Sequence, residues 1–367
     1  MQTRQKRMIA LLAAAICLIA IWAAATLWPN KVTVAVDAPL MSKLIFDPSD
    51  MDAARFYFEE NPDSRMQLKE IFYDFDPQHS GPRFEAAFEE GVEFFVTTQP
   101  SSTLTASSHL FATPGPLIIN TSATSPSMSG QDDYMLRIIA DARQEQKAIA
   151  EYVGTLPGQR LLVLQDSANA AYTDPAFKFF LQDLQQQDRW RVIHERFKFE
   201  TFDPEKLATV MAQPFDVLYV LGGDFQASMG NIVQLFYTHH PQVPIVLTPW
   251  ARSNAIYETA GPAIDNMVLL SHHPAKTSDP AIANYMHRFK ARFGYQPMAM
   301  ALMVRQALEI LEQAIAQGHT EPDQVRNYLL SQQRLSTSLG DIELDRFGDR
   351  VQTFYPIDTL EAELKTP

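Results

Sequence analysis

Short apolar runs alternate with longer helix-like segments along most of the chain after residue 30. KVTVAV (31–36), GVEFFV (91–96), RLLVLQD (160–166) and FDVLYVLGG (215–223) are compact apolar runs of the length typical of buried strands. Strands that alternate with helices form parallel sheets with helices on both faces. Because the rhythm occurs in both halves, we predict an α/β protein of two lobes, each a mostly parallel sheet flanked by helices.

The remaining elements are predicted from the same patterns. We expect further strands at 71–75, 116–120, 191–197 and 244–249, and a strand before the segment LLSHHPAK (269–276). The tail 340–357 predicts a hairpin that turns at 347–349. Helices are expected over 50–60, 84–91, 134–154, 176–187, 204–213, 228–240, 280–293 and 298–317.

Length, charge and cysteine content limit the possible functions. The 367 residues suffice for two domains. A net charge of -13 argues against nucleic-acid binding, which needs a basic surface. Cys17 is the single cysteine and lies in the N-terminal apolar run, so the folded part has no disulfide, thiolate metal site or cysteine nucleophile.

The N-terminus predicts export. Arg4, Lys6 and Arg7 precede an apolar stretch that extends to Trp28. A basic start, an apolar centre and small residues near Ala25 fit a cleaved signal peptide, which we favour. The run is also long enough for an uncleaved anchor in the inner membrane over residues 8–28. In either case we expect the rest of the chain to be extracytoplasmic, in the periplasm.

Two segments rich in Ser and Thr follow apolar runs: VTTQPSSTLTAS (96–107) and NTSATSPSMSG (120–130). Hydroxyls and free backbone N–H groups at the end of a strand attract anions when a helix begins there. Such residues also cap helices and form turns, and the local sequence alone favours capping. The two interpretations have to be separated by the rest of the chain.

Several motifs, in order, resemble the type I periplasmic binding proteins, in particular the leucine/isoleucine/valine-binding branch that serves ABC transporters. The resemblance covers roughly residues 31–358. It rests on VAVDAPL (34–40), YDFDP (73–77), PSSTLTA (100–106), SATSP (122–126) and GDIELDRFGD (340–349).

The resemblance implies two discontinuous lobes and three crossings between them. The first lobe would comprise 31–155 and 275–335, and the second 156–274 and 336–360. The crossings would lie near 154–159, 271–276 and 334–340.

The resemblance also implies a ligand site. Ser101 and Thr124 would hold a ligand carboxylate, with Ser102 and Thr103 adjacent, and the carbonyl of Ser122 would accept from a ligand ammonium. Two aromatic residues would form walls of the site, Phe46 on the first lobe and Tyr172 on the second.

One position departs from the family's pattern. Amino-acid binders place an acid after the strand that corresponds to VLYVLGG (217–223), whereas this chain has Ala227 or Ser228 there. Asp224 lies earlier and could replace that acid or cap the following helix. A buried ammonium without a partner is costly, so a carboxylate or another polar metabolite is nearly as good a candidate as an amino acid.

Other functions find less support. The pairs His239-His240 and His272-His273 are neighbours that do not share a face, and we expect them on the solvated surface. The sequence has no metal-binding, phosphate-loop or GxSxG motif, so we expect no cofactor, no metal and no enzymatic activity. The expected partners are a small-molecule ligand and an ABC permease. The alternative is a membrane-anchored sensory receptor of the same fold that reports to a signalling protein.

Overall fold

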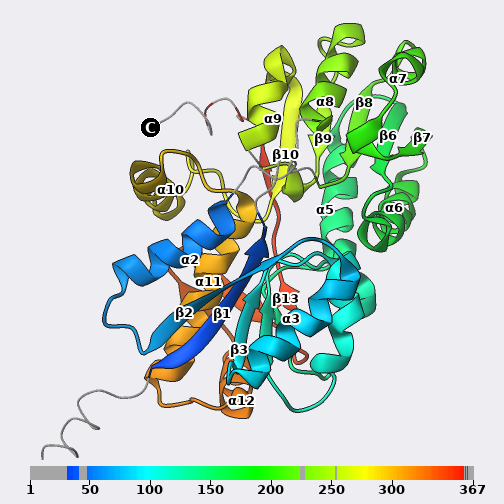
Figure 1. The fold of residues 1–367 in the computed structure, drawn as a ribbon. Coiled ribbons are helices and arrows are strands. Elements are labelled where there is room, and N and C mark those ends of the chain that lie inside the picture. Colours follow the sequence, from blue (N-terminus) through cyan, green and yellow to red (C-terminus); the bar gives the residue numbers. More distant parts are fainter. Residues whose placement is uncertain are drawn as a thin grey trace, which may run out of the picture.

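The chain forms two α/β lobes, which lie one above the other in Figure 1. The structure is a computed structural model that describes residues 31–40, 48–223, 228–252 and 254–358, together with 360 and 362. The predicted N-terminal signal or anchor segment and the residues Phe46 and Asp224 lie outside the described residues. Within the described residues, no helix combines the length and the hydrophobicity that a bilayer crossing requires.

The first lobe contains a parallel sheet of five strands in the order β2-β1-β3-β4-β5. Side chains alternate between its faces: Val34 and Val36 belong to one core cluster, and Ala35 belongs to another on the opposite face. The strands are β1 (Val32–Pro39), β2 (Met66–Tyr73), β3 (Phe94–Thr97), β4 (Leu117–Asn120) and β5 (Met135–Arg137).

Helices cover both faces of this sheet. The face that includes Val34 packs against α2 (Ser49–Glu60), α11 (Ala299–Ala316) and α12 (Pro322–Ser331), and the other packs against α3 (Pro77–Glu89). A single helical turn, α4 (Ser101–Leu104), follows β3. The helices α2 and α11 lie side by side in the first lobe although they are far apart in the sequence (Figure 1).

The second lobe contains a sheet of six strands in the order β14-β10-β9-β8-β6-β7, in which only β14 runs antiparallel. Its strands are β6 (Arg160–Asp166), β7 (Arg191–Phe197), β8 (Val217–Leu221), β9 (Ile245–Leu247), β10 (Met267–Ser271) and β14 (Tyr355–Ile357). Helices α5 (Ala142–Thr155) and α6 (Ala170–Leu184) pack on one face. Helices α7 (Pro204–Met211), α8 (Ser228–His239) and α9 (Asn254–Thr259) pack on the other.

The remaining elements lie outside the two main sheets and the helices that cover them. Helix α10 (Pro280–Phe293) leads from the second lobe to α11. A small antiparallel sheet consists of β11 (Leu335–Thr337), β12 (Gly340–Leu344) and β13 (Arg350–Val351). The 3-10 turns are η1 (Thr105–Leu110), η2 (Pro126–Met128), η3 (Gln185–Gln187), η4 (Phe199–Thr201), η5 (Pro249–Ala251) and η6 (Gly261–Asn266).

The predicted fold class is confirmed, but three predicted helices begin at other residues. Helix α3 begins at Pro77 instead of residue 84 and α6 at Ala170 instead of residue 176, and α5 begins later than expected. Instead of a helix over 134–154, Met135–Arg137 forms the edge strand β5 beside β4. Helix α5 begins only at Ala142, because the Asp141 carboxylate accepts hydrogen bonds from the N–H groups of Arg143 and Gln144. The apolar run before Asp141 is compatible with both states, and pairing with β4 decides in favour of a strand.

The predicted hairpin is present, and it packs on the first lobe. Strands β12 and β13 are antiparallel, and Gly348 has a φ of 90°, which favours glycine in the turn. The carboxylate of Asp349 pairs with the buried guanidinium of Arg137 at 2.7 Å, and the carbonyl of Gly348 accepts from the Arg137 N–H at 2.8 Å. The hairpin therefore contacts β5, although residues from 336 onward were expected in the second lobe.

These contacts lead us to propose different lobe boundaries from those expected. Helix α5 packs against α6 of the second lobe, and β14 pairs with β10 there. The chain would then cross between the lobes at 138–141, 272–279 and 352–354. The first lobe would comprise 31–137 and 280–351, and the second lobe would comprise 142–271 and 355–360.

Candidate functional site

A cavity of about 530 Å³ lies between the two lobes, and it is lined by residues that follow the carboxyl ends of strands in both sheets. Ligands of open α/β sheets bind at that edge because the loops that leave parallel strands converge there. The first lobe contributes Tyr73, Asp74, Phe75, Thr98, Pro100, Ser102, Ser122, Thr124 and Met300. The second lobe contributes Asp166, Ala168, Asn169, Tyr172, Lys198, Phe199, Glu200, Gly223, Ser228 and Trp250.

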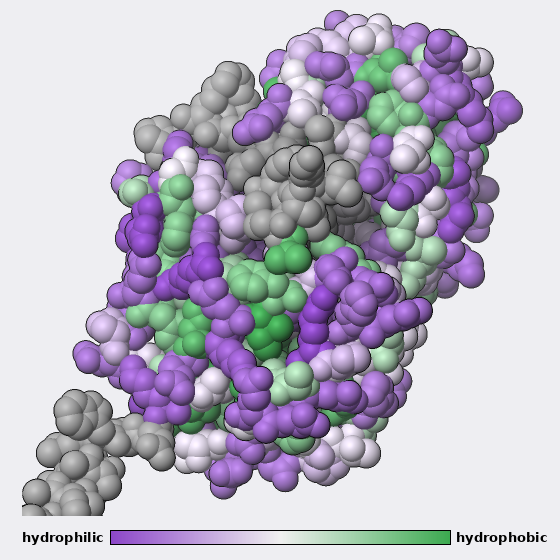
Figure 2. All heavy atoms as spheres, viewed as in Figure 1, coloured by the Kyte–Doolittle hydropathy of each residue, from purple (hydrophilic) through white to green (hydrophobic). Residues whose placement is uncertain are grey.

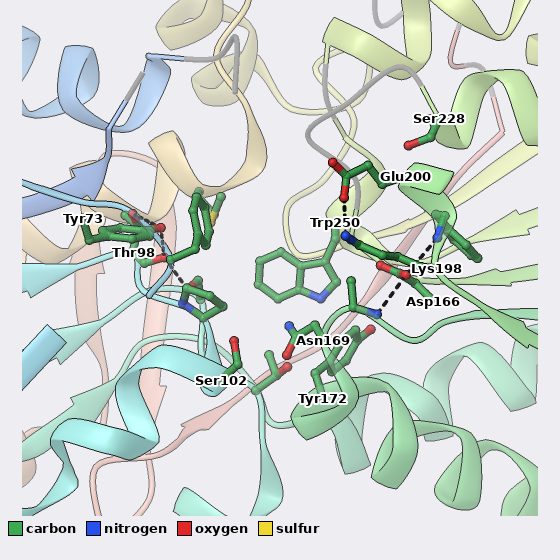
Figure 3. Close-up of a pocket in the computed structure, with 18 of the residues that line it drawn as sticks. Tyr73, Thr98, Ser102, Asp166, Asn169, Tyr172, Lys198, Glu200, Ser228 and Trp250 are labelled. Carbon is green, nitrogen blue, oxygen red and sulfur yellow. Dashed lines mark hydrogen bonds and ion pairs between the residues drawn. The ribbon is translucent and has the colours of Figure 1, made fainter. Parts of the chain in front are cut away.

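The figures show the surroundings of this cavity. In Figure 2 apolar side chains gather on the front of the first lobe, from its centre towards the boundary with the second lobe, and most of the remaining surface in this view is hydrophilic. In Figure 3 the Trp250 indole projects between the first-lobe residues Tyr73 and Thr98 and the second-lobe residues Lys198 and Glu200. Both lobes thus present side chains to one space.

In the first Ser/Thr segment, one residue lines the cavity and two others hold the loop in place by hydrogen bonds. Ser102 lines the cavity. Ser101 is buried beneath the loop, where its Oγ accepts a hydrogen bond from the Ser125 N–H at 2.9 Å. Thr103 is also buried, and its hydroxyl donates to the Pro100 carbonyl at 3.0 Å. Of the three residues singled out in this segment, only Ser102 lines the cavity, and the other two fasten the loop.

The second Ser/Thr segment contributes two lining residues. The Ser122 hydroxyl donates to the carbonyls of Thr98 at 2.7 Å and Gln99 at 2.8 Å, which ties the loop after β4 to the loop after β3. Thr124 also lines the cavity, and its carbonyl accepts from the Ala142 N–H at 2.8 Å. Thr124 therefore contacts the first residue of α5.

Tyr172 lines the cavity from α6 on the opposite lobe, and the resemblance implies an aromatic wall at this residue. Its hydroxyl donates to the carboxylate of Glu145, and burial raises the Tyr172 pKa well above its ordinary value, so the hydroxyl stays protonated. Its ring packs edge-on against that of Trp250, with 6.4 Å between centroids. The two rings form one wall of the cavity.

A buried carboxyl supports this wall. Glu145 is fully buried on α5, and its Oε1 accepts from the Tyr172 hydroxyl and from the Gln146 amide at 2.7 Å. Gln146 accepts in turn from the Tyr219 hydroxyl at 2.7 Å. Burial raises the pKa of the Glu145 carboxyl to about 7, and the hydrogen bonds from Tyr172 and Gln146 oppose that shift. Glu145 thus changes charge near neutral pH beside a cavity wall.

The acids that line the cavity already have partners within the chain. Asp74 accepts from Arg83 at 2.7 Å and His79 at 2.8 Å, and these contacts hold its pKa well below the usual range. Glu200 pairs with Lys198 at 2.6 Å.

The third lining acid, Asp166, accepts hydrogen bonds from backbone N–H groups. It accepts from the N–H groups of Ala168 and Phe199, each at 3.1 Å, while burial raises its pKa. None of the three lining carboxylates among the described residues therefore lacks a donor from its own chain.

Sequence analysis missed several lining residues, above all Trp250, Asn169 and Lys198. Each lies within a few positions of the end of a predicted strand, which was the available signal. The segments that resemble the family's ligand loops lie mainly on the first lobe. The second-lobe residues become candidates only once the second sheet is known to face the first.

The expectation that His272 and His273 lie on the solvated surface is wrong. Both side chains are buried in the segment that passes between the lobes. His272 packs against Trp250, with 5.3 Å between ring centroids, and His273 Nε2 meets the Gln306 amide oxygen at 2.9 Å. Burial lowers the pKa of His273 to about 3, so it is neutral at ordinary pH. No group of acids and histidines within the described residues is arranged to hold a metal ion.

The fold and the cavity between facing strand ends define a two-lobed binding protein of the type I periplasmic class. The sequence matches the family described as periplasmic binding protein over residues 47–355. The chain belongs to this family, which confirms the resemblance read from its motifs and implies an extracytoplasmic location. No curated protein matches the chain.

Solved structures of similar fold include three solute-binding proteins. A leucine-binding protein, LivK, from Thermotoga maritima is 17% identical with a TM-score of 0.75, and the match covers 89% of this chain and 94% of that one. A solute-binding protein of an ABC transporter from Rhodopseudomonas palustris, in complex with 3,4-dihydroxybenzoic acid, is 15% identical with a TM-score of 0.76, covering 89% and 92%. LivJ from Streptococcus pneumoniae, in complex with isoleucine, is 15% identical with a TM-score of 0.73, covering 89% and 95%.

Proposed function

We propose that the protein captures a small carboxylate or amino-acid-like solute in the cavity between its lobes and delivers it to an ABC permease. The observation that carries this proposal is the cavity of about 530 Å³ at the facing strand ends of the two sheets, with Ser and Thr residues on the first lobe and aromatic rings from both lobes. This size and mixture are typical of sites for small organic ligands. Family membership supports solute binding, and the ligand class is our inference.

The first lobe would hold the carboxylate. Ser102 and Thr124 line the cavity, and the hydroxyl of each is a donor that a carboxylate oxygen can use. The hydroxyl of Ser122 is already engaged by two carbonyls, so its role would be to fix the loop. The R. palustris and S. pneumoniae relatives were bound to 3,4-dihydroxybenzoic acid and isoleucine, both of which carry a carboxylate.

The second lobe would enclose the ligand. Tyr172 and Trp250 come from segments beyond the first crossing, so a ligand held by Ser102 and Thr124 would meet them across the cleft. Three chain crossings allow rotation about one axis and resist sliding, which favours a hinged closure. Contacts made with both lobes would supply the free energy of closure.

Whether the N-terminal segment is cleaved decides which partner protein the chain would serve. We infer that residues 1–28 direct export as a signal peptide, which would leave a free carrier that serves a permease. The second candidate is a membrane-anchored receptor that signals to a partner protein, and the length of the apolar run over residues 8–28 favours it. The intact mass of the exported protein separates the two, because loss of the segment supports the carrier and retention supports the receptor.

A thermal-shift screen tests the proposed site. Leucine, succinate, benzoate and glucose are each added at several concentrations, and at least one carboxylate should raise the melting temperature, since a ligand at 100 times its Kd stabilises by about 2.7 kcal/mol. Thr124→Val should weaken that carboxylate roughly tenfold, as expected for a lost charge-assisted hydrogen bond of about 1.4 kcal/mol. Thr113→Val, at an exposed position outside the cavity, is the matched control. Stabilisation by glucose alone would refute the proposal.

A further inference from the structure

Asn169 lines the cavity, and its side-chain oxygen lacks the hydrogen bond expected at its position in the helix. It is the N-cap of α6, where an asparagine oxygen ordinarily accepts from the N–H groups of the first turn. Here its side chain makes no capping hydrogen bond. Its Oδ1 is nevertheless buried and has no hydrogen-bond partner. In Figure 3 the amide lies below the Trp250 indole, between Ser102 and Tyr172.

A buried amide oxygen without a donor is costly, and native proteins leave few of them. Because Asn169 lines the cavity, a ligand can supply the missing donor. The donor could be a charged ammonium or a neutral hydroxyl or N–H group. An ammonium taken out of water needs a carboxylate to compensate for its charge. Among the described lining carboxylates, Asp74 and Glu200 are paired with cations, and Asp166 accepts two backbone N–H groups on Oδ1. A neutral donor needs no counter-charge in this setting, so we favour it over an ammonium.

The rest of the wall favours a flat ring. The cavity is lined by Phe75 and Tyr73 from the first lobe and by Phe199, Tyr172 and Trp250 from the second. Aromatic rings pair favourably with other rings in offset or edge-on arrangements, so these five residues offer contacts to a flat aromatic ligand.

The backbone at Phe75 adds independent support. Its φ is 63°, in the left-handed region that bulky residues rarely adopt. Residues held in such conformations concentrate at ligand sites, because the surrounding structure has to maintain them. The ring of Phe75 packs edge-on against Tyr73, with 4.9 Å between centroids, and both line the cavity.

We propose that the ligand is a hydroxylated aromatic carboxylate whose hydroxyl donates a hydrogen bond to Oδ1 of Asn169. This inference rests on the proposed function, in which Ser102 and Thr124 hold the carboxylate. It assigns Asn169 as the residue that separates phenolic acids from both plain aromatic acids and zwitterionic amino acids.

Calorimetric titration of three probes tests the inference: 3,4-dihydroxybenzoate, benzoate and leucine. Each is titrated into the wild-type protein, into Asn169→Leu and into Asn284→Leu, a control at an exposed position on α10. The wild-type and control proteins should bind 3,4-dihydroxybenzoate at least ~10-fold more tightly than benzoate, as one buried hydrogen bond permits. In Asn169→Leu this ratio should fall close to one while benzoate affinity is kept. An unchanged melting temperature without ligand shows that the variant folds.

The outcomes separate this inference from the proposed function. If benzoate and 3,4-dihydroxybenzoate bind the wild-type protein equally, or if Asn169→Leu weakens both alike, the role of Asn169 is refuted and carboxylate binding stands. If leucine binds most tightly, the ligand is an amino acid, and the phenolic inference is wrong although the proposed function holds. If no carboxylate of either panel binds, both proposals fall together.

Discussion

Replacing Glu145 by glutamine should make the protein more stable, and the gain should depend on pH. Glu145 is fully buried, and burial raises the pKa of its carboxyl from the ordinary 4.5 to about 7. Above pH 7 the folded protein therefore carries a buried negative charge that water would solvate better in the unfolded chain. Glutamine keeps the shape and the acceptor oxygen for Tyr172 without the charge.

The sign and the size follow from proton linkage. Between pH 4.5 and 7 the folded state holds a proton on Glu145 that the unfolded state has lost, so stability falls as the pH rises through this window. Above both pKa values the penalty is about 3 kcal/mol, at about 1.4 kcal/mol for each pKa unit. At pH 5 less than about 1 kcal/mol of it remains. The advantage of Glu145→Gln over the wild type should therefore widen by about 2 to 3 kcal/mol between pH 5 and pH 8.

Urea denaturation of both proteins at pH 5, 6, 7 and 8, followed by circular dichroism, measures this difference. Comparing the two proteins at each pH cancels the other titrating groups. Glu151→Gln, at an exposed glutamate on the same helix, is the control and should show no such trend. A stability difference that stays constant from pH 5 to pH 8 would refute the assignment of a buried, neutral-pH carboxyl to Glu145.

Three further predictions concern the lobes and the cleft. Asp349→Ala should lower the free energy of unfolding, measured by urea denaturation, by about 3 to 5 kcal/mol, because it leaves the buried Arg137 guanidinium without its carboxylate. A decrease below about 1 kcal/mol would mean that the hairpin does not pack on Arg137. Ser122→Ala should cost only about 1 kcal/mol by the same assay, since the carbonyls of Thr98 and Gln99 keep other donors, and a collapse of the fold would contradict this reasoning. Tyr172→Ala should speed ligand dissociation about tenfold in stopped-flow measurements and change association far less; an equal effect on association would mean that Tyr172 takes part in first contact.

Sequence patterns predicted the architecture because most of its helices and strands are specified by their own local sequence. RLLVLQD forms β6 over the predicted residues, and helix 280–293 has the predicted bounds, because apolar runs and caps specify them. The exceptions depend on distant partners. The strand at Met135–Arg137 exists because β4 lies beside it, and α12 was missed because it buries only Val325 and Leu329.

Of the residues that line the candidate site, those on the first lobe were easier to anticipate than those on the second. The resemblance named Ser102, Ser122 and Thr124, which line the cavity because two hydroxyl-rich segments follow neighbouring strands of one sheet. Trp250 and Asn169 carry no motif, and their relevance comes from the way two sheets face each other. The same long-range packing buries His272 and His273 between the lobes, where adjacent histidines suggested a surface.

The central claim is that one small ligand is held by both lobes at once. Small-angle X-ray scattering of the exported protein, with and without a saturating ligand from the carboxylate screen, tests it directly. A ligand that contacts Ser102 and Thr124 on one lobe and Tyr172 and Trp250 on the other should close the hinge and lower the radius of gyration in a single step. An unchanged radius of gyration, with calorimetry proving that the ligand is bound, would contradict closure around a ligand shared by the two lobes.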